Sequence, residues 1–172
     1  MNPSHVSNRS SRRQRHTGFT LIEVLVVVAV IAIAAGLIVV NLEGDDRRAT
    51  EREAGRLAGA LEHAASLAQW RSETLGFSAD GSGYRFWRRG ADNRWTALRD
   101  DEVLAARALP AQWSVAPVSY AGAPVPSDVI LPFRPSGRNE PYVLALASPS
   151  WTFVVAGDPL NRVQVAQSTA SR

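Results

Sequence analysis

The most chemically constrained residue of this sequence is Glu23, a carboxylate inside an apolar segment. From Phe19 to Leu42 nearly every side chain is apolar, and residues 24–40 contain no polar side chain. A charged residue at the centre of a membrane-spanning helix costs about 2.5 to 3.5 kcal/mol on insertion scales, and such residues are usually paired and functional. The sequence therefore predicts that a cation neutralises Glu23.

The other reactive side chains form no pattern typical of an enzyme. The chain has no cysteine, and His63 is the only histidine outside the first 18 residues. A Ser–His–Asp site would have to use His63, and neither a metal-ligand cluster nor a Gly-rich phosphate loop is present. For the pair Asp100-Asp101 we favour a solvated turn over a cation site. We predict a non-enzymatic protein without metal or cofactor.

The charge distribution bears on possible nucleic-acid partners. The formal net charge of the 172-residue chain is +3, but four arginines lie in the first 18 residues: Arg9, Arg12, Arg13 and Arg15. After removal of residues 1–18 the chain carries 15 Arg against 16 Asp and Glu, a net charge of −1. The shortened protein has no overall basic field to attract nucleic acid.

The N-terminal elements place Glu23 in a membrane. Residues 1–18 are a polar, basic leader, and residues 19–42 form an apolar helix of roughly 36 Å, which exceeds the hydrocarbon core of about 30 Å. The positive-inside rule puts the leader in the cytoplasm and the residues after Leu42 outside. A secretory signal, with small-residue patterns at residues 32–36, and a simple anchor are alternatives, but neither explains Glu23.

The string Gly18-Phe19-Thr20-Leu21-Ile22-Glu23 resembles the processing site of type IV pilins and type II secretion pseudopilins. The resemblance implies that prepilin peptidase cuts between Gly18 and Phe19 and methylates the new amine of Phe19. Gly18 suits such a site because a residue without a side chain allows close approach of the backbone. By this resemblance the chain becomes one subunit of a membrane-anchored helical filament.

Cleavage supplies the cation that Glu23 requires. The new α-amine has an ordinary pKa of about 7.7 to 8.0, and in a family filament the carboxylate of an incoming subunit faces the Phe19-type amine of a neighbour. At about 4 Å and an effective dielectric near 20, this pair is worth roughly 4 kcal/mol before desolvation is subtracted. That attraction is sufficient to set the axial register of subunits related head to tail in an open helix.

Beyond the membrane the sequence predicts an α+β pseudopilin fold. Residues 43–73 continue the helix with an apolar stripe of Leu57, Leu61, Ala64, Ala65 and Ala68. The charged residues of the opposite face are expected in solvent or at subunit contacts: Arg47, Arg52, Glu53, Arg56 and Glu62. Residues 74–172 read as an all-β periplasmic domain, a sandwich of two packed sheets.

The β-domain sequence contains eight candidate strands and one proline-rich stretch. The strands are predicted at residues 75–79, 84–88, 95–98, 113–118, 129–133, 142–147, 151–156 and 160–165. Asp80-Gly81-Ser82-Gly83 predicts a hairpin turn. Residues 117–135 contain five prolines and are expected to form a partner-facing loop with at most edge strands. Most of the five tryptophans are expected in the core.

The stretch from Val129 to Arg138, with Phe133 to Gly137 reading F-x-P-x-G, looks like the pseudopilin H and minor pilin FimT family. This resemblance implies a minor pseudopilin near the tip of a type II secretion pseudopilus, which helps to export folded proteins across the outer membrane. Retention of Glu23 argues against the tip-capping pseudopilin K, where that carboxylate is typically absent. The alternative is a FimT-like type IV pilus minor pilin in DNA uptake, but Arg134, Arg138, Arg162 and Arg172 give only a thin basic excess there.

The same resemblance implies the partners and the location of the protein. The expected partners are prepilin peptidase, the other major and minor pseudopilins and the inner-membrane assembly platform, with the secretin and exoprotein cargo as further candidates. The expected location is the bacterial inner membrane, as a single-pass protein with a cytoplasmic N-terminus and a periplasmic C-terminal domain. Nucleic acid is not favoured as a partner.

The processing site generates a direct prediction. Coexpression with a prepilin peptidase should shorten the chain by 18 residues and leave methylated Phe19 as the first residue, as measured by intact-protein mass spectrometry. Cleavage near Ala34 instead would identify a secretory signal and contradict the filament interpretation.

Overall fold

The computed structural model describes residues 21–168, with the backbone alone for residues 34–44. The chain divides into two compact units, residues 1–40 and residues 41–172. One helix, α1 (Leu21–Arg71), contributes to both units. The processing residues Gly18 and Phe19 lie outside the described residues.

The C-terminal end of α1 is closed by its own backbone. Ser72 adopts a left-handed conformation with φ of 51°. The N–H of Ser72 donates to the carbonyl of Gln69 at 3.2 Å, and the N–H of Glu73 donates to the carbonyl of Ala68 at 3.1 Å. These two bonds form a Schellman motif, which satisfies carbonyls that the helix itself leaves unpaired. The chain turns here into the first strand.

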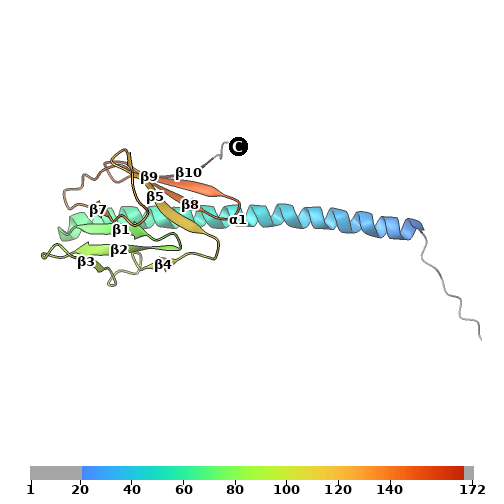
Figure 1. Ribbon diagram of the computed structural model, residues 1–172, viewed down its shortest axis with the longest axis horizontal. Helices are drawn as coiled ribbons and strands as arrows, with labels where there is room; N and C mark the ends of the chain where they lie inside the picture. The colour runs from blue at the N-terminus through green and yellow to red at the C-terminus, as the bar shows by residue number, and fades with distance from the viewer. Residues whose placement is uncertain (1–20, 169–172) are drawn as a thin grey trace, which may run out of the picture. The chain divides into compact units, whose positions relative to one another are not determined.

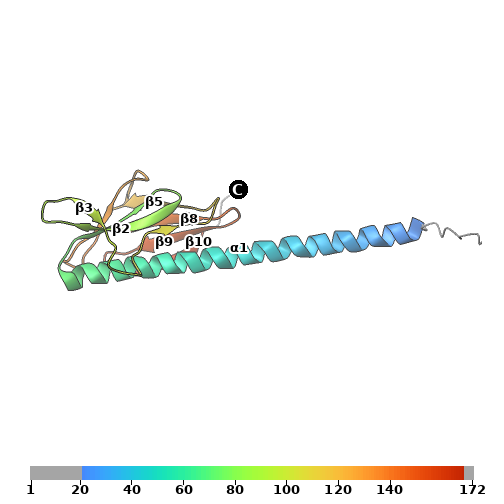
Figure 2. The same cartoon turned by 90° about the horizontal axis from the view of Figure 1, so that it is seen from below.

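The second unit contains two five-stranded antiparallel sheets, and Figure 2 shows the part of α1 in this unit lying along one side of the strands. The first sheet has the order β3-β2-β1-β7, with β4 also paired to β2: β1 (Leu75–Ala79), β2 (Gly83–Arg89), β3 (Trp95–Ala97), β4 (Arg107–Ala108) and β7 (Leu131–Phe133). The second sheet has the order β10-β9-β8-β5-β6: β5 (Ser114–Tyr120), β6 (Ala123–Pro124), β8 (Tyr142–Ala147), β9 (Thr152–Gly157) and β10 (Val163–Gln167). Four of these strands, β5, β8, β9 and β10, are labelled in Figure 1.

A single hydrophobic core joins the helix to both sheets. The stripe residues Leu57 and Leu61 are fully buried, as are Phe77 of the first sheet and Leu144 of the second. Alanines fill the helix positions between the leucines, so the helix backbone can approach the strands closely: Ala54, Ala58, Ala60, Ala64, Ala65 and Ala68. The predicted fold class, a long helix followed by a two-sheet domain, is confirmed.

The predicted β1–β2 hairpin is present and also connects the sheets. Leu75 pairs with Arg88 and Ala79 with Tyr84, and Gly81 has φ of 88° in the turn. The carbonyl of Gly81 accepts a 3.0 Å hydrogen bond from the N–H of Val115, at the start of β5. The turn glycine therefore fixes one sheet against the other.

Residues 117–135 were predicted to form a loop with at most edge strands, and the structure departs from this only at β5, which is not an edge strand. Strand β5 runs through Pro117 to Tyr120, with a register shift between Pro117 and Ser119, and β7 occupies Leu131–Phe133 at the edge of its sheet. Proline is tolerated in β5 because only its last two residues pair with the short β6, so Pro117 needs no bond on that side. Residues 121–128 are exposed except for half-buried Val125, and they include the two-residue edge strand β6.

The prediction that most tryptophans lie in the core is wrong. None of the five is fully buried, and Trp70 is 91% exposed on the helix. Trp87 and Trp95 lie on the outer face of the first sheet, where Arg85 and Arg89 cover their rings at 5.8 and 5.6 Å. Phenylalanine and leucine fill the core instead, because they have no polar atom that must be satisfied there.

Two glycines predict opposite effects on stability. A methyl group at Gly157 would collide with the ring of Tyr142, whereas Gly59 on α1 has nothing within 4 Å of that position. Gly157→Ala should lower the thermal midpoint, since the 3% exposed Tyr142 has little room to move. Gly59→Ala should raise it, because alanine is favoured over glycine in a helix by roughly 0.5 to 1 kcal/mol. Thermal unfolding followed by circular dichroism measures both; equal effects would contradict the packing described here.

Candidate assembly and processing sites

Glu23 is the one predicted site residue within the described part of the chain. It lies in the first turn of α1, and its side chain is exposed in the isolated subunit. A carboxylate is favourable at this end of a helix, because the unpaired N–H groups of the first turn carry partial positive charge. The geometry of Glu23 therefore leaves its carboxylate accessible from outside the subunit.

The helix around Glu23 presents large apolar side chains on all sides. Residues 21–33 are all exposed, and the exposed fractions of the large apolar ones range from 48% at Val27 to 84% at Leu21. An apolar surface of this extent marks a lipid or protein interface. Within the described residues, no helical stretch has both the length and the apolarity that crossing a membrane requires.

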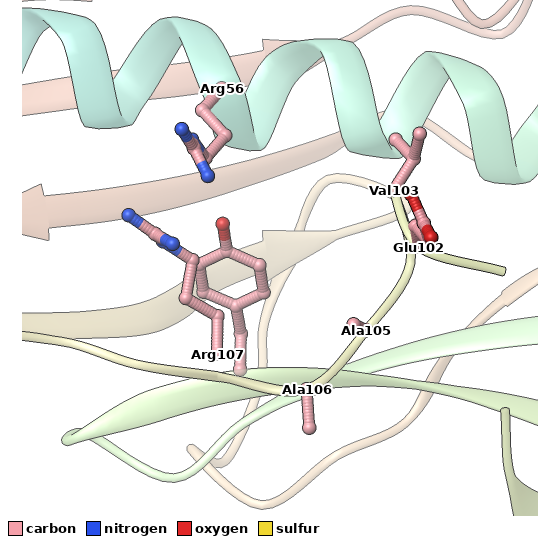
Figure 3. A pocket seen from close by; sticks show the side chains of 7 residues that line it. Arg56, Glu102, Val103, Ala105, Ala106 and Arg107 are labelled. Atoms are coloured by element: carbon pink, nitrogen blue, oxygen red, sulfur yellow. The ribbon is translucent and has the colours of Figure 1, made fainter. Parts of the chain in front are cut away.

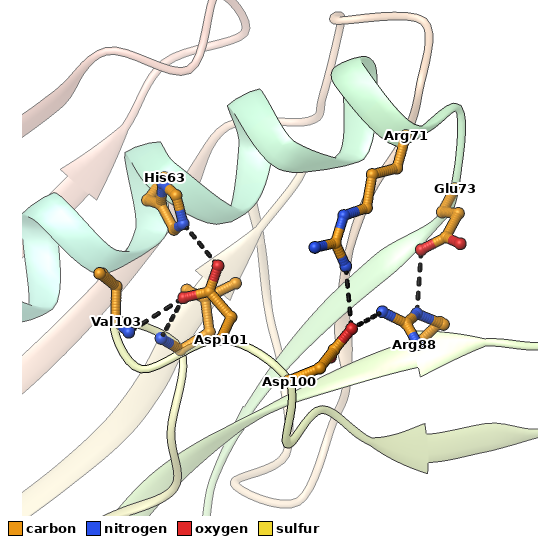
Figure 4. A network of polar contacts seen from close by, with 8 residues as sticks. His63, Arg71, Glu73, Arg88, Asp100, Asp101 and Val103 are labelled. Atoms are coloured by element: carbon orange, nitrogen blue, oxygen red, sulfur yellow. Dashed lines mark hydrogen bonds and ion pairs between the residues drawn. The ribbon is translucent and has the colours of Figure 1, made fainter.

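The segment between β3 and β4 is fastened to α1 by a polar network (Figure 4). His63 of α1 donates from Nε2 to Asp101 at 2.9 Å, and Arg71 near the helix end donates to Asp100 at 3.1 Å. Asp100 also accepts a 2.8 Å bond from Arg88, which is paired at 2.9 Å with Glu73. Asp100 and Asp101 thus attach the segment between β3 and β4 to α1, and His63 has a structural role in this contact.

The carboxylates of this network have lowered pKa values. The hydrogen bond from Arg88, together with that from Arg71, lowers the pKa of Asp100 to about 2. For Asp101, partial burial opposes ionisation, but the bonds from His63 and from the N–H of Leu104 outweigh it and lower the pKa below its usual value. Both groups remain charged at neutral pH. Among the described residues, no group of three or more His, Cys, Asp or Glu side chains could hold a metal ion.

A second contact joins the helix to β4 through a buried carboxylate. Glu53, 8% exposed, accepts bonds on both oxygens from Arg107, with 2.6 Å between Arg107 Nη2 and Glu53 Oε2. The hydroxyl of Tyr84 donates to Glu53 Oε1 at 3.2 Å. Burial, reinforced by the nearby Glu53 charge, raises the pKa of Tyr84 above its ordinary value, so this hydroxyl stays protonated and available as a donor.

The expectation that Glu53 faces solvent is therefore wrong. Glu53 lies one turn before Leu57, at i and i+4, which places it at the margin of the buried stripe rather than opposite it. The position of Glu53 beside the buried stripe was the sequence feature that could have indicated a buried carboxylate. Its partner Arg107 could not be identified, because the two-residue strand β4 that carries it has no recognisable pattern.

The F-x-P-x-G stretch forms the connection from one sheet to the other. Phe133 is buried and packs edge-on against Tyr142 with 5.9 Å between ring centroids. Gly137 has φ of 76°, and a side chain there would meet Gln69 of α1 at 2.9 Å. The positive φ favours glycine, whereas the end of the exposed Gln69 side chain could move aside, so this part of the motif preserves a turn next to the helix.

A buried asparagine completes the turn. Asn139 accepts a 2.7 Å bond from the N–H of Arg134 and donates at 2.6 Å to Asn161, which in turn donates to the carbonyl of Gly137 at 2.8 Å. These bonds attach the crossover to the β9–β10 connection. Sequence reasoning missed Asn139 because the hydrogen bonds involve residues far apart in the chain.

Comparison with known proteins identifies the family. Residues 13–39 match the model of the prokaryotic N-terminal methylation motif. The chain is 31% identical over 101 residues to type II secretion system protein H of Aeromonas hydrophila, a match that covers 58% of this chain and 55% of that protein. It is 30% identical over 135 residues to type II secretion system protein H of Escherichia coli K12, covering 76% of this chain and 73% of that protein.

The chain belongs to the type II secretion system protein H family. Solved structures share the fold of this protein H family member. The minor pseudopilin EpsH of Vibrio cholerae matches it with a TM-score of 0.56 at 17% identity, over 69% of this chain and 96% of that one. The type IV minor pilin FimU of Pseudomonas aeruginosa matches with a TM-score of 0.51 at 16% identity, over 72% and 96%. The fold is thus shared with a pilin, whereas the sequence relatives favour secretion over the DNA-uptake alternative.

The lowered pKa of Asp100 predicts a pH dependence of stability. Because its folded-state pKa of about 2 lies below the unfolded value of about 3.9, ionised Asp100 stabilises the fold above pH 4, and this contribution is lost as the pH falls toward 2. Asp100→Asn should therefore lower the thermal midpoint at pH 6 and flatten its decline between about pH 4 and 2.

The matched control is Asp128→Asn, since exposed Asp128 makes no hydrogen bond or ion pair with a described residue. It should reproduce the wild-type acid profile. An identical profile for Asp100→Asn would show that the network does not contribute to folding stability.

Proposed function

We propose that this chain is a minor pseudopilin that assembles near the tip of a periplasmic type II secretion pseudopilus and helps to export folded proteins across the outer membrane. The observation that carries the proposal is the joint presence of a methylation-motif match over residues 13–39 and of protein H relatives that extend into the β-domain. Its role is structural, as a filament subunit rather than a catalyst.

Maturation proceeds in this proposal at the cytoplasmic face of the inner membrane. Prepilin peptidase removes residues 1–18 and methylates the amine of Phe19. Residues 19–42 anchor the subunit as a single-pass segment, with residues 43–172 in the periplasm. The apolar composition of residues 19–42 and the exposure of the large side chains in residues 21–33 support an environment that changes from lipid to filament interior.

Glu23 sets the register during assembly. Its accessible carboxylate attracts the Phe19 amine of a neighbouring major or minor pseudopilin, and the apolar surroundings strengthen that attraction by excluding water. The inner-membrane assembly platform inserts the subunit, while the secretin and the exoprotein cargo act later in the pathway. The exposed residues of the stretch 121–128 are available for partner contacts.

Glu23→Ala tests this role. The variant should still enter the membrane and lose its 18-residue leader, but its incorporation into pseudopili should fall by about tenfold or more, because the amine of the neighbour loses its counter-ion. Incorporation is measured by quantifying the subunit in sheared pseudopili by immunoblot.

Glu51→Ala is the matched control, since Glu51 is an exposed carboxylate on the same helix and lies outside the apolar segment. It should assemble like the wild type. Unchanged incorporation of Glu23→Ala would contradict the register role, and absence of the wild-type chain from pseudopili would contradict the proposed function itself.

A further inference from the structure

A groove on the periplasmic unit brings three arginines together beside α1. A cavity of about 310 Å³ lies between α1 and residues 102–107, and a neighbouring hollow of about 330 Å³ shares Arg56 and Arg107 with it. Arg52 also lines the second hollow. Figure 3 shows the side chains of Arg56 and Arg107 reaching toward one another from the helix and from β4. We call the surface formed by Arg52, Arg56 and Arg107 the arginine groove.

The positive charge of the arginine groove is only partly compensated. Glu53 neutralises Arg107 through two hydrogen bonds and has a third bond from Tyr84, so its lone pairs are largely used. Arg52 and Arg56 are exposed, and neither has a hydrogen bond or ion pair with a residue that the structure describes. Two guanidinium groups thus lie beside a third without a direct ion pair to a described residue.

This arrangement is unfavourable for the isolated subunit. Arg52 and Arg56 are four residues apart on one helix, a spacing at which like charges repel. Walls of low dielectric on both sides of a groove concentrate the resulting potential, which raises the local concentration of anions. Guanidinium groups bind carboxylates through paired, geometrically specific hydrogen bonds. The groove therefore has the charge and the donors to accept a carboxylate.

The lining favours a carboxylate on a protein over a nucleic-acid strand. Glu53 and Glu102 in the same walls offset part of the arginine charge, so the small remaining positive charge suits a short acidic segment better than a long row of phosphates. Trp113 and Pro110 flank the arginines and offer an apolar surface to the methylene groups of an acidic side chain. Two uncompensated arginines match one or two carboxylates, whereas nucleic-acid binding requires a longer row of cations.

We propose that the arginine groove receives the carboxylate of an acidic segment on a neighbouring pseudopilin subunit. This inference rests on the proposed function, since it assumes that the chain lies in a filament. The contact is electrostatic, forms between periplasmic units and is separate from the Glu23 contact in the apolar segment. It orients the β-domain of one subunit against the next.

The first test reverses the groove charge in the full-length chain, expressed with the secretion machinery. The double variant Arg52→Glu/Arg56→Glu should reduce co-purification of other pseudopilins by about tenfold, because an incoming carboxylate now meets two like charges. The matched control is Arg94→Glu/Arg138→Glu, which changes the net charge equally at exposed positions away from the groove. The control should stay within about twofold of the wild type.

Folding and processing are checked in the same samples. Equal thermal midpoints and complete leader removal in both double variants would attribute a loss of co-purification to the groove alone. If the Glu variant unfolds, Arg52→Gln/Arg56→Gln replaces it and should reduce co-purification by severalfold. Wild-type co-purification by the folded charge-altered variant would overturn the inference while leaving the proposed function intact, since the wild-type chain would still assemble.

The second test identifies the occupant. A photoreactive side chain in place of Arg56, in the full-length chain within assembled pseudopili, should cross-link to a segment of another pseudopilin that contains Asp or Glu, as mapped by mass spectrometry. The same group at position 138 serves as the control and should not yield that cross-link. Cross-links from position 56 to DNA alone, to lipid alone or to no partner would overturn the inference.

Discussion

The structure of the second unit, residues 41–172, depends on burial of one helical stripe beneath two sheets. Most of the other buried helix positions around Leu57 and Leu61 are alanines, which let the strands approach the helix closely. The aromatic side chains of the first sheet belong to the same core. Each sheet alone would expose an apolar face, so neither could fold by itself. The helix is therefore the common surface on which both sheets assemble.

The polar contacts of α1 fix the orientation of the helix in this packing. Apolar contact alone would tolerate rotation or sliding of the helix, but hydrogen bonds require particular pairs of atoms. Glu53 binds β4, His63 binds the segment before it, and Gln69 lies against the turn at Gly137. Contacts spaced along the helix thus fix its rotation and its position relative to the strands.

The two units of the chain use charge in opposite ways. In the N-terminal unit a single carboxylate, Glu23, lies in an apolar surface, a setting in which charged groups are usually paired. In the second unit, residues 41–172, many carboxylates have arginine partners, whereas Arg52 and Arg56 have no ion pair with a described residue. An assembly of such subunits can combine one contact in the apolar segment with a separate contact in water.

The sequence by itself determined the features encoded in contiguous residues. The processing motif and its apolar continuation are local, and the family match at residues 13–39 falls on them. Helical periodicity predicted the buried stripe, and alternation with turn residues predicted β1, β2 and β8 closely, because these patterns repeat within a few residues. The fold class followed from them.

The tertiary structure alone decided which distant residues meet. Glu53 and Arg107 are separated by 54 residues, and their contact exists only because β4 pairs with β2 beside the helix. Likewise Asn139 contacts Asn161 because the crossover between the sheets lies beside the β9–β10 connection, and none of the five tryptophans is fully buried. Such contacts depend on strand pairing and chain crossing, which leave no local pattern in the sequence.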